Sequence, residues 1–304
     1  MKRLLPPAPD VSAHRRLSRL AVGLLALLAF AVPQMAAAKP PVWVLHAGAT
    51  TITLFGSIHL LPAGLDWRPP ELDAALAGAS ELWFELPIDA ATNDEAAAQS
   101  IARGALPKGR SLIAMMTPDQ AQQMIDAGVS LNCAPEALDR MQPWMADLTL
   151  SIAEDARSGA SASDGVEGLI QAATSPTVKR RAFETASQQI GFLAGAPVKD
   201  QIASLNWTVS EIQKDPTSYQ RAVDEWMAGD LDGLESDALD PLRQISPTLF
   251  SRLIDNRNRH WASVLAARLK QPGSVVVVVG VGHLIGPGGL PALLRAKGYR
   301  VDGP

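Results

Sequence analysis

Hydrophobic positions follow two patterns along the chain, with short apolar runs near both ends and helical periodicity between them. The runs at residues 42–46 and 51–55 are separated by Ala47-Gly48-Ala49-Thr50, and together they predict a β-hairpin. Near the other end, the uninterrupted valines at 275–279 are typical of a parallel strand that is covered on both faces. Further strands are predicted at 81–86, 180–183 and 300–301.

The middle of the chain predicts helices. A helix opens at Pro69-Pro70, because proline is favoured in the first helical turn. The other predicted helices are several short ones within 89–173, a long one over 197–227 broken at Asp215-Pro216, one over 246–270, and one over 287–297 that ends at Gly298. Strands at both ends that enclose a helical middle predict an α/β (α+β) fold. We expect one sheet-containing domain, built from the N- and C-terminal segments, with a large helical insertion.

The first 38 residues have the pattern of an export signal. A basic start that includes Arg15, Arg16 and Arg19 precedes an apolar stretch over 20–32, and small residues end at Ala38. We expect residues 1–38 to be a cleaved signal peptide and residues 39–304 to form the domain, in the periplasm or secreted. The stretch is short for a membrane span, so no stable span is expected after cleavage. The alternatives are an uncleaved anchor and a twin-arginine signal.

Charge and cysteine content limit the kinds of binding partner and the disulfide bonds that we expect of the chain. The formal net charge is −4 and the basic residues are scattered, so we expect no nucleic-acid partner. The single cysteine, Cys133, has no partner for an internal disulfide, and it is interpreted as a packing residue because no nearby group would lower its pKa.

Two similar turns carry the first candidate chemistry. Gly56-Ser57-Ile58-His59 and Gly280-Val281-Gly282-His283 each place a histidine directly after a predicted buried strand. Binding groups collect at the carboxyl ends of strands in α/β sheets, so His59 and His283 are expected to share a site. A hydrogen-bonded turn histidine is the alternative for each. Of the others, His46 is expected in the core or at an edge, and His260 facing solvent.

Two glutamates and one helix add candidates. Glu85 follows Leu82-Trp83-Phe84 at a strand end, and Glu184 follows another short strand. Burying a carboxylate there without a cation or hydrogen-bond donors costs free energy, so both glutamates are candidate site residues. The alternative is that each lies at an exposed strand end. In the helix over 246–270, Arg257 lies on the apolar stripe and Asn258 at its border. An inward guanidinium needs an anionic partner; the alternative is an arginine that snorkels to the rim.

A further carboxylate is a weaker candidate. Asp164-Gly165-Val166-Glu167 places two carboxylates at a helix start, where they also complement the helix dipole. Glu167 therefore has an equal claim to helix initiation and to a role in the site.

In this order along the chain, the segments resemble the TraB/GumN/Tiki family. The matching stretches are 54–62 (LFGSIHLLP), 82–86 (LWFEL), 164–169 (DGVEGL), 182–185 (AFET), 226–230 (WMAGD), 257–258 (RN) and 279–287 (VGVGHLIGP). The resemblance implies a conserved pair of Gly-x-x-His motifs with a glutamate and an arginine. Its Tiki members resemble manganese- or cobalt-associated proteases that clip a secreted signalling protein, and its bacterial members are usually exported. The family often has aspartate where this chain has Glu167.

Two functions follow as hypotheses. The first is a divalent-metal-dependent hydrolase, most readily a peptidase. Its metal ligands would be His59, His283 and a carboxylate, Glu85 or in its place Glu184. Its catalytic groups would be Glu85, Glu184, Arg257 and Asn258. The resemblance implies manganese or cobalt, and a two-histidine, one-carboxylate set also suits zinc. There is no His-Glu-x-x-His motif, which excludes an ordinary zincin. The second is a non-catalytic exported protein that binds a peptide, a saccharide or a pheromone-like ligand with the same polar cluster.

Overall fold

The computed structural model describes residues 39–304, and the predicted signal peptide lies outside the described residues. The strands are β1 (Val42–Ala47), β2 (Thr50–Ser57), β3 (Leu61–Pro62), β4 (Glu81–Phe84), β5 (Ala160–Ser161), β6 (Lys179–Ala182), β7 (Gly273–Gly280) and β8 (Val301–Asp302). The α-helices are α2 (Pro70–Ala77), α3 (Ala90–Gly104), α4 (Pro118–Ser130), α5 (Pro135–Leu138), α6 (Pro143–Arg157), α7 (Val166–Ala173), α8 (Ala186–Ala194), α9 (Val198–Lys214), α10 (Ser218–Ala228), α11 (Leu231–Leu234), α12 (Asp240–Ile245), α13 (Pro247–Phe250), α14 (Asn256–Arg268) and α15 (Leu290–Ala296). Short 3₁₀ turns are η1 (Ile113–Met115), η2 (Ala162–Asp164) and η5 (Val281–His283), and π-helical turns are η3 (Glu235–Leu239) and η4 (Ser251–Asp255).

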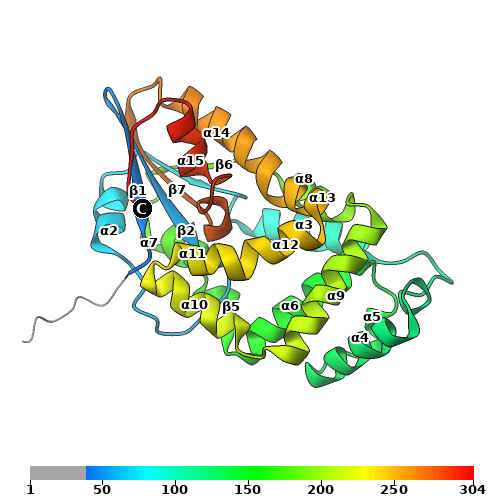
Figure 1. The fold of residues 1–304 in the computed structure, drawn as a ribbon. Helices are drawn as coiled ribbons and strands as arrows, with labels where there is room; N and C mark the ends of the chain where they lie inside the picture. The colour runs from blue at the N-terminus through cyan, green and yellow to red at the C-terminus, as the bar shows by residue number, and fades with distance from the viewer. Residues whose placement is uncertain (1–38) are drawn as a thin grey trace, which may run out of the picture. The chain divides into compact units, whose positions relative to one another are not determined.

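The main sheet joins the two ends of the chain. Its order is β6-β4-β7-β2-β1-β8, so strand β7 from the C-terminal part lies between β2 and β4 from the N-terminal part. Strands β6, β4, β7 and β2 are parallel, whereas β1 and β8 run antiparallel to their neighbours. The predicted α/β class and the helical insertion are confirmed, and Figure 1 shows α4, α5, α6 and α9 gathered away from β1 and β2.

Both faces of the sheet are covered, as the valine run predicts. Val276 and Val278 face one apolar core, into which α2, α7 and α10 contribute Leu72, Ile170 and Trp226 among others. The alternate valines of β7 face a second core with Trp261 and Leu265 of α14 and Leu290 and Leu294 of α15. A third core lies wholly within α4, α5, α6 and α9 and the short turns that join them. The alternation of side chains along a strand accounts for the division between the two faces.

The predicted helix over 246–270 differs from the structure in one informative way. It is interrupted by the π-helical turn η4, which lies between α13 and α14. Phe250, before this turn, packs in the first core, whereas Trp261, after it, packs in the second. The single apolar stripe expected from a continuous helix is therefore divided between the two faces of the sheet. The predicted break at Asp215-Pro216 is confirmed, because α9 ends at Lys214.

Among residues 39–304, no helix combines the length and the apolar character that a membrane crossing requires.

Candidate functional site

The carboxyl ends of the four parallel strands bring the candidate residues to one edge of the sheet. β2 and β7 are neighbours in register, with Ser57 paired to Gly280, so the turns that carry His59 and His283 leave the sheet side by side. Glu85 directly follows β4 on the other side of β7, and Glu184 follows β6. Arg257 and Asn258 come from the first turns of α14. The structure thus places these six side chains at or beside one edge.

Arg257 is the centre of a buried ion network. Its guanidinium donates to both carboxylate oxygens of Glu184, at 2.8 and 2.9 Å, and also to Glu85. A third donor reaches the backbone carbonyl of Leu253 at 3.0 Å. The ring of Trp261 lies 4.7 Å from the guanidinium carbon, which is within the range of a cation–π contact. The anionic partners that an inward arginine requires are therefore Glu85 and Glu184.

The two carboxylates of this network differ in their proton affinity. Burial favours the neutral form of Glu85, but the charge of Arg257 and the N–H of Gly280, which donates to Oε1 at 2.8 Å, outweigh this and lower its pKa. Burial raises the pKa of Glu184, and the nearby Glu85 carboxylate adds to this, although Arg257 opposes it. Gln189 of α8 also donates to Glu85, at 3.1 Å. Glu85 is thus held as a carboxylate.

His283 is fixed as a neutral imidazole of one tautomer. Arg257 Nη1 lies 2.9 Å from His283 Nε2, and because a guanidinium only donates, Nε2 must accept. The proton is therefore on Nδ1, which donates to Oδ1 of Asn258 at 2.6 Å. The Asn258 amide is oriented in turn by its Nδ2, which donates to the carbonyl of Gly288 at 2.8 Å. Burial, together with the Arg257 charge, lowers the pKa of His283 to about 3.

His59 lies in the opposite environment. Its side chain is 60% exposed, compared with 6% for His283. Its Nδ1 lies 2.6 Å from a carboxylate oxygen of Glu167, which also accepts from the hydroxyl of Ser57 at 2.5 Å. The charge of Glu167 raises the pKa of His59 to about 9. The Glu167 carboxylate therefore orients the ring through Nδ1 and leaves Nε2 on the other side.

The close approach of α7 explains why Glu167 reaches His59. A Cβ atom on Gly165 would lie 2.0 Å from the carbonyl oxygen of His59, so only glycine allows this contact. The N–H of Val166 then donates to the carbonyl of Ile58 at 3.2 Å. The sequence left the role of Glu167 open between helix initiation and the site; the structure brings it into contact with His59. The glycine before it was the signal for this contact.

Two cavities meet at His59, Glu85 and Gln189. One, of about 440 Å³, is also lined by Phe84, Ile88 and Glu167. The other, of about 390 Å³, contains Arg257 and His283 and has an apolar wall. Its apolar residues are Leu148, Ile190, Phe192, Leu193, Leu253 and Ile254. The site therefore offers a polar centre with apolar surface on either side, as ligand-binding clefts commonly do.

The donor atoms around Gly280 include some, but not all, of the ligands that a divalent metal ion requires. A Cβ on Gly280 would lie 3.3 Å from Glu85 Oε1 and 3.5 Å from His59 Nε2, so both atoms border the space that the glycine leaves open. Imidazole nitrogen and carboxylate oxygen are ligands of manganese, cobalt and zinc. Among residues 39–304, however, no group of three or more His, Cys, Asp or Glu side chains is arranged to hold a metal. The lone pair of His283 that would complete the set accepts from Arg257.

The sequence profile of the TraB/PrgY/gumN family matches residues 41–303. The chain belongs to this family. It is similar to the protein YbaP of Escherichia coli (strain K12), which carries the description uncharacterized, with 26% identity over 257 residues that cover 84% of this chain and 92% of the relative. A YbaP of Shigella flexneri is 27% identical over 243 residues, which cover 80% of this chain and 87% of the relative. No solved structure was found to match.

Proposed function

We propose that the chain is a hydrolase that acts on peptide bonds with the help of a divalent metal ion held by His59 and Glu85. The observation that carries the proposal is the orientation of His59. Glu167 accepts from its Nδ1, and its Nε2 borders the same open space as Glu85 Oε1. A carboxylate that orients a histidine in this way is the usual support of a metal-ligating imidazole.

The bound metal would supply a water of lowered pKa and polarise the scissile carbonyl. Manganese and cobalt are the metals that the family resemblance favours. His283 joins the ligands only if Arg257 withdraws from its Nε2, because one lone pair serves one partner at a time.

The chain's own residues have separate tasks in this proposal. Arg257 is a positioning residue that keeps Glu85 ionised and fixed, together with the N–H of Gly280 and the amide of Gln189. Glu184 balances the charge of Arg257, and Asn258 fixes the tautomer of His283. The apolar wall beside Arg257 would receive an apolar side chain of the substrate.

Metal binding is the first test. Titration of the purified chain with MnCl2 and CoCl2, followed by calorimetry, should show binding that His59→Ala and Glu85→Gln each weaken at least tenfold. His46→Ala is the matched control, because His46 is an exposed histidine on β1. Equal affinity of His59→Ala and the parent chain would overturn the metal site.

Peptide cleavage is the second test. A peptide library incubated with the chain and MnCl2 should be cut, and a chelator should abolish the cutting. Metal binding without any cleavage would instead favour the second function, a non-catalytic protein that binds a peptide or saccharide. One structural fact favours this alternative, namely that residues 39–304 contain no ready group of three metal donors.

Export belongs to the proposal on the strength of the sequence pattern alone. Residues 1–38 have the basic, apolar and small-residue order of a signal peptide, so we place the chain in the periplasm or outside the cell. The mass of the chain recovered from a bacterial periplasmic fraction should correspond to cleavage after Ala38. Recovery of the intact chain in the membrane fraction would point to an anchor instead.

A further inference from the structure

The turn that carries His59 lacks the regular backbone structure of its counterpart. Residues 58–60 belong to no helix or strand. The turn that carries His283 is instead the 3₁₀ turn η5, which the N–H of Leu284 closes by donating to the carbonyl of Val281 at 2.9 Å. The backbone groups around His59 therefore need hydrogen-bond partners from elsewhere in the chain, because an unpaired buried carbonyl is unfavourable.

Helix α10 supplies two of these partners. The indole Nε1 of Trp226 donates to the carbonyl of Gly56 at 2.9 Å, and the hydroxyl of Tyr219 donates to the carbonyl of Leu60 at 2.9 Å. Gly56 is buried and lies one residue past the end of the pairing between β1 and β2. The indole therefore donates to a carbonyl that β1 does not reach.

The two donors lie on one face of α10 and contact the chain on both sides of His59. Positions seven residues apart in a helix are about two turns apart, so their side chains point the same way. Between the two carbonyls that they hold, the carbonyl of Ile58 accepts from the N–H of Val166 at 3.2 Å. The carbonyls of residues 56, 58 and 60 are thus each held from outside the turn, two of them by α10.

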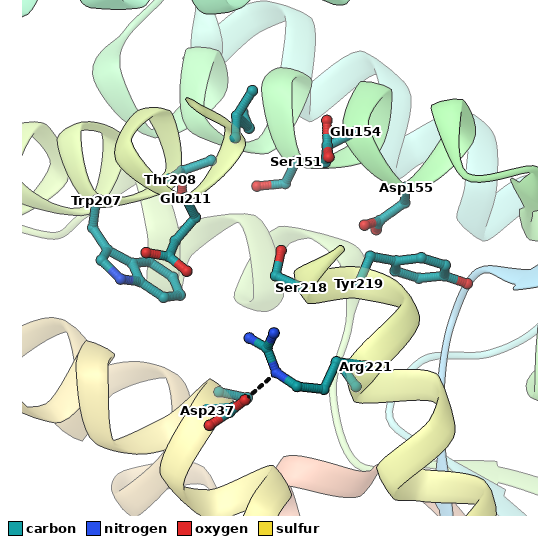
Figure 2. A pocket seen from close by; sticks show the side chains of 13 residues that line it. Ser151, Glu154, Asp155, Trp207, Thr208, Glu211, Ser218, Tyr219, Arg221 and Asp237 are labelled. Atoms are coloured by element: carbon teal, nitrogen blue, oxygen red, sulfur yellow. Dashed lines mark hydrogen bonds and ion pairs between the residues drawn. The ribbon is translucent and has the colours of Figure 1, made fainter. Parts of the chain in front are cut away.

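Helix α10 is itself held in place at several points. Trp226 is fully buried in the first core, where its ring packs against Phe55 of β2. Arg221, which lies between the two donors in the sequence, pairs with Asp237 of η3 at 2.5 Å. Figure 2 shows this pair, with the ring of Tyr219 on the same helix pointing away from it. The helix is therefore fixed to both the core and η3, as a support for the turn requires.

The same segment also contacts the second turn. A Cβ atom on Gly282 would lie 3.2 Å from Cδ2 of Leu239 in η3, and a Cβ atom on Gly286 would collide with the carboxylate of Glu235. These glycines lie immediately before and shortly after His283. The segment from α10 to η3 therefore touches both Gly-x-x-His turns.

This arrangement accounts for the stretch 226–230, which resembles the family and which the metal site alone leaves unexplained. Trp226 contacts the turn, and Gly229, with a φ of 71°, ends α10 in the left-handed conformation that favours glycine. Asp230 then caps α11 by accepting from the N–H of Gly233 at 2.9 Å. The stretch thus combines a contact to the turn with the chain reversal that leads to η3.

We infer that Tyr219 and Trp226 are positioning residues for His59. Together they hold the backbone before and after this residue, so that its Nδ1 meets Glu167 while its Nε2 borders the space beside Glu85. The effect on metal binding rests on the role proposed above for His59, whereas the position of its ring can be measured in the metal-free chain.

Nuclear magnetic resonance of the metal-free chain, labelled with ¹⁵N-histidine, tests the position of the ring. Tyr219→Phe removes only the hydroxyl, so the imidazole signals of His59 should shift or broaden while those of His283 stay unchanged. His59→Ala identifies the His59 signals by their loss. Tyr299→Phe is the matched control, because the hydroxyl of Tyr299 donates to a carbonyl of α14, that of Ala266, at 3.5 Å. Unchanged His59 signals in Tyr219→Phe would overturn the inference.

Metal affinity gives the functional readout. Loss of an outer contact to a ligating histidine commonly weakens metal binding tenfold or more, and this contact acts one step further out, so Tyr219→Phe should bind MnCl2 about threefold more weakly in calorimetry. Tyr299→Phe should bind it as the parent chain does. Equal weakening in both tyrosine variants would overturn the inference, because it would reflect a general loss of stability.

A second variant tests the other donor. Trp226→Phe keeps a ring in the first core and removes the indole N–H, so it should change the His59 signals in the same way, with circular dichroism as the check that it is folded. If the parent chain binds no MnCl2, or if His59→Ala binds it equally well, the metal site fails. The His59 signals of the metal-free Tyr219→Phe chain then decide the positioning role by themselves.

Discussion

The turns after β2 and β7 carry the same Gly-x-x-His pattern and place their histidines in opposite states. His59 is exposed and faces a carboxylate, which raises its pKa to about 9 as long as no metal ion competes with the proton for Nε2. His283 is buried and faces a guanidinium and an amide, so its pKa falls to about 3 and it stays neutral. Burial is the main cause at His283 and the Glu167 charge is the main cause at His59, and the partner at Nδ1 also differs, Glu167 in one turn and Asn258 in the other. Similar motifs therefore predict a shared location but not a shared charge.

The largest expected effect comes from removing Arg257, the cation that pairs with both buried carboxylates. Arg257→Met leaves Glu85 and Glu184 buried without their counter-charge, so we expect a loss of about 3–5 kcal/mol in the free energy of unfolding. Urea unfolding followed by circular dichroism measures it. Arg243→Met is the control, because the half-exposed pairs of Arg243 with Glu235 and Asp240 are worth at most about 1 kcal/mol. Equal losses in both variants would show that burial does not set the strength of the network.

Alanine substitutions of His59 and His283 should have the next largest effects on stability, and these effects should be unequal. His283→Ala leaves an Arg257 N–H and the Asn258 carbonyl without partners and removes a ring that packs 4.5 Å from Trp261. We expect it to cost about 2–4 kcal/mol of unfolding free energy. His59→Ala should cost less than this, because the ring of His59 is largely exposed to solvent, which screens its pair with Glu167. The same urea titration compares them, and a larger loss for His59→Ala would reverse the comparison.

Glu167→Gln gives His59 the neutral kind of partner that His283 has. Its pKa should fall from about 9 toward 6.5, because the largest cause of the increase is the Glu167 charge. NMR titration of the imidazole protons measures this. Because the folded chain stabilises protonated His59, this residue adds to the free energy of unfolding below pH 6.5. The contribution is lost as the pH rises through about 9. The loss of stability at alkaline pH should therefore be smaller in Glu167→Gln than in the parent chain.

Asn258→Asp makes the reciprocal change and should have the smallest effect on a pKa. A carboxylate at Nδ1 favours the protonated imidazole, so the pKa of His283 should rise above about 3. Burial and the Arg257 charge still oppose protonation, so it should stay below the pKa of His59. The same NMR titration tests this. A His283 pKa equal to that of His59 would mean that the Nδ1 partner alone decides the state.

The sequence predicted where the site lies better than how its groups pair. Strand ends locate His59, Glu85, Glu184 and His283, because parallel strands bring the residues after them to one edge of the sheet. Periodicity places Arg257 inward, and it is buried. The pairing of Arg257 with Glu85 and Glu184 depends on where α14 crosses that edge, which no local pattern encodes. Likewise, the contact of Gln189 with Glu85 depends on the packing of α8 and was missed.

The signal for the Glu167 contact was present but ambiguous. A glycine before a helix start serves a turn in most proteins, and here Gly165 also permits backbone contact with His59. Local patterns were easier to interpret where they concern one helix only. His260 is exposed on α14, as predicted, and Thr185 caps α8 by accepting from the N–H of Gln188.

The π-helical turn η4 joins a helical segment that packs in the first core to a helical segment that packs in the second. A π-type hydrogen bond spans one residue more than an α-type bond, so the turn changes which face of the helix meets the sheet by roughly one residue, about 100° of rotation. A deletion of one residue within η4 would restore a regular α-helix. The segment could then no longer both bury Phe250 in the first core and place Arg257 next to Glu85. The length of this turn therefore determines where the guanidinium of Arg257 lies.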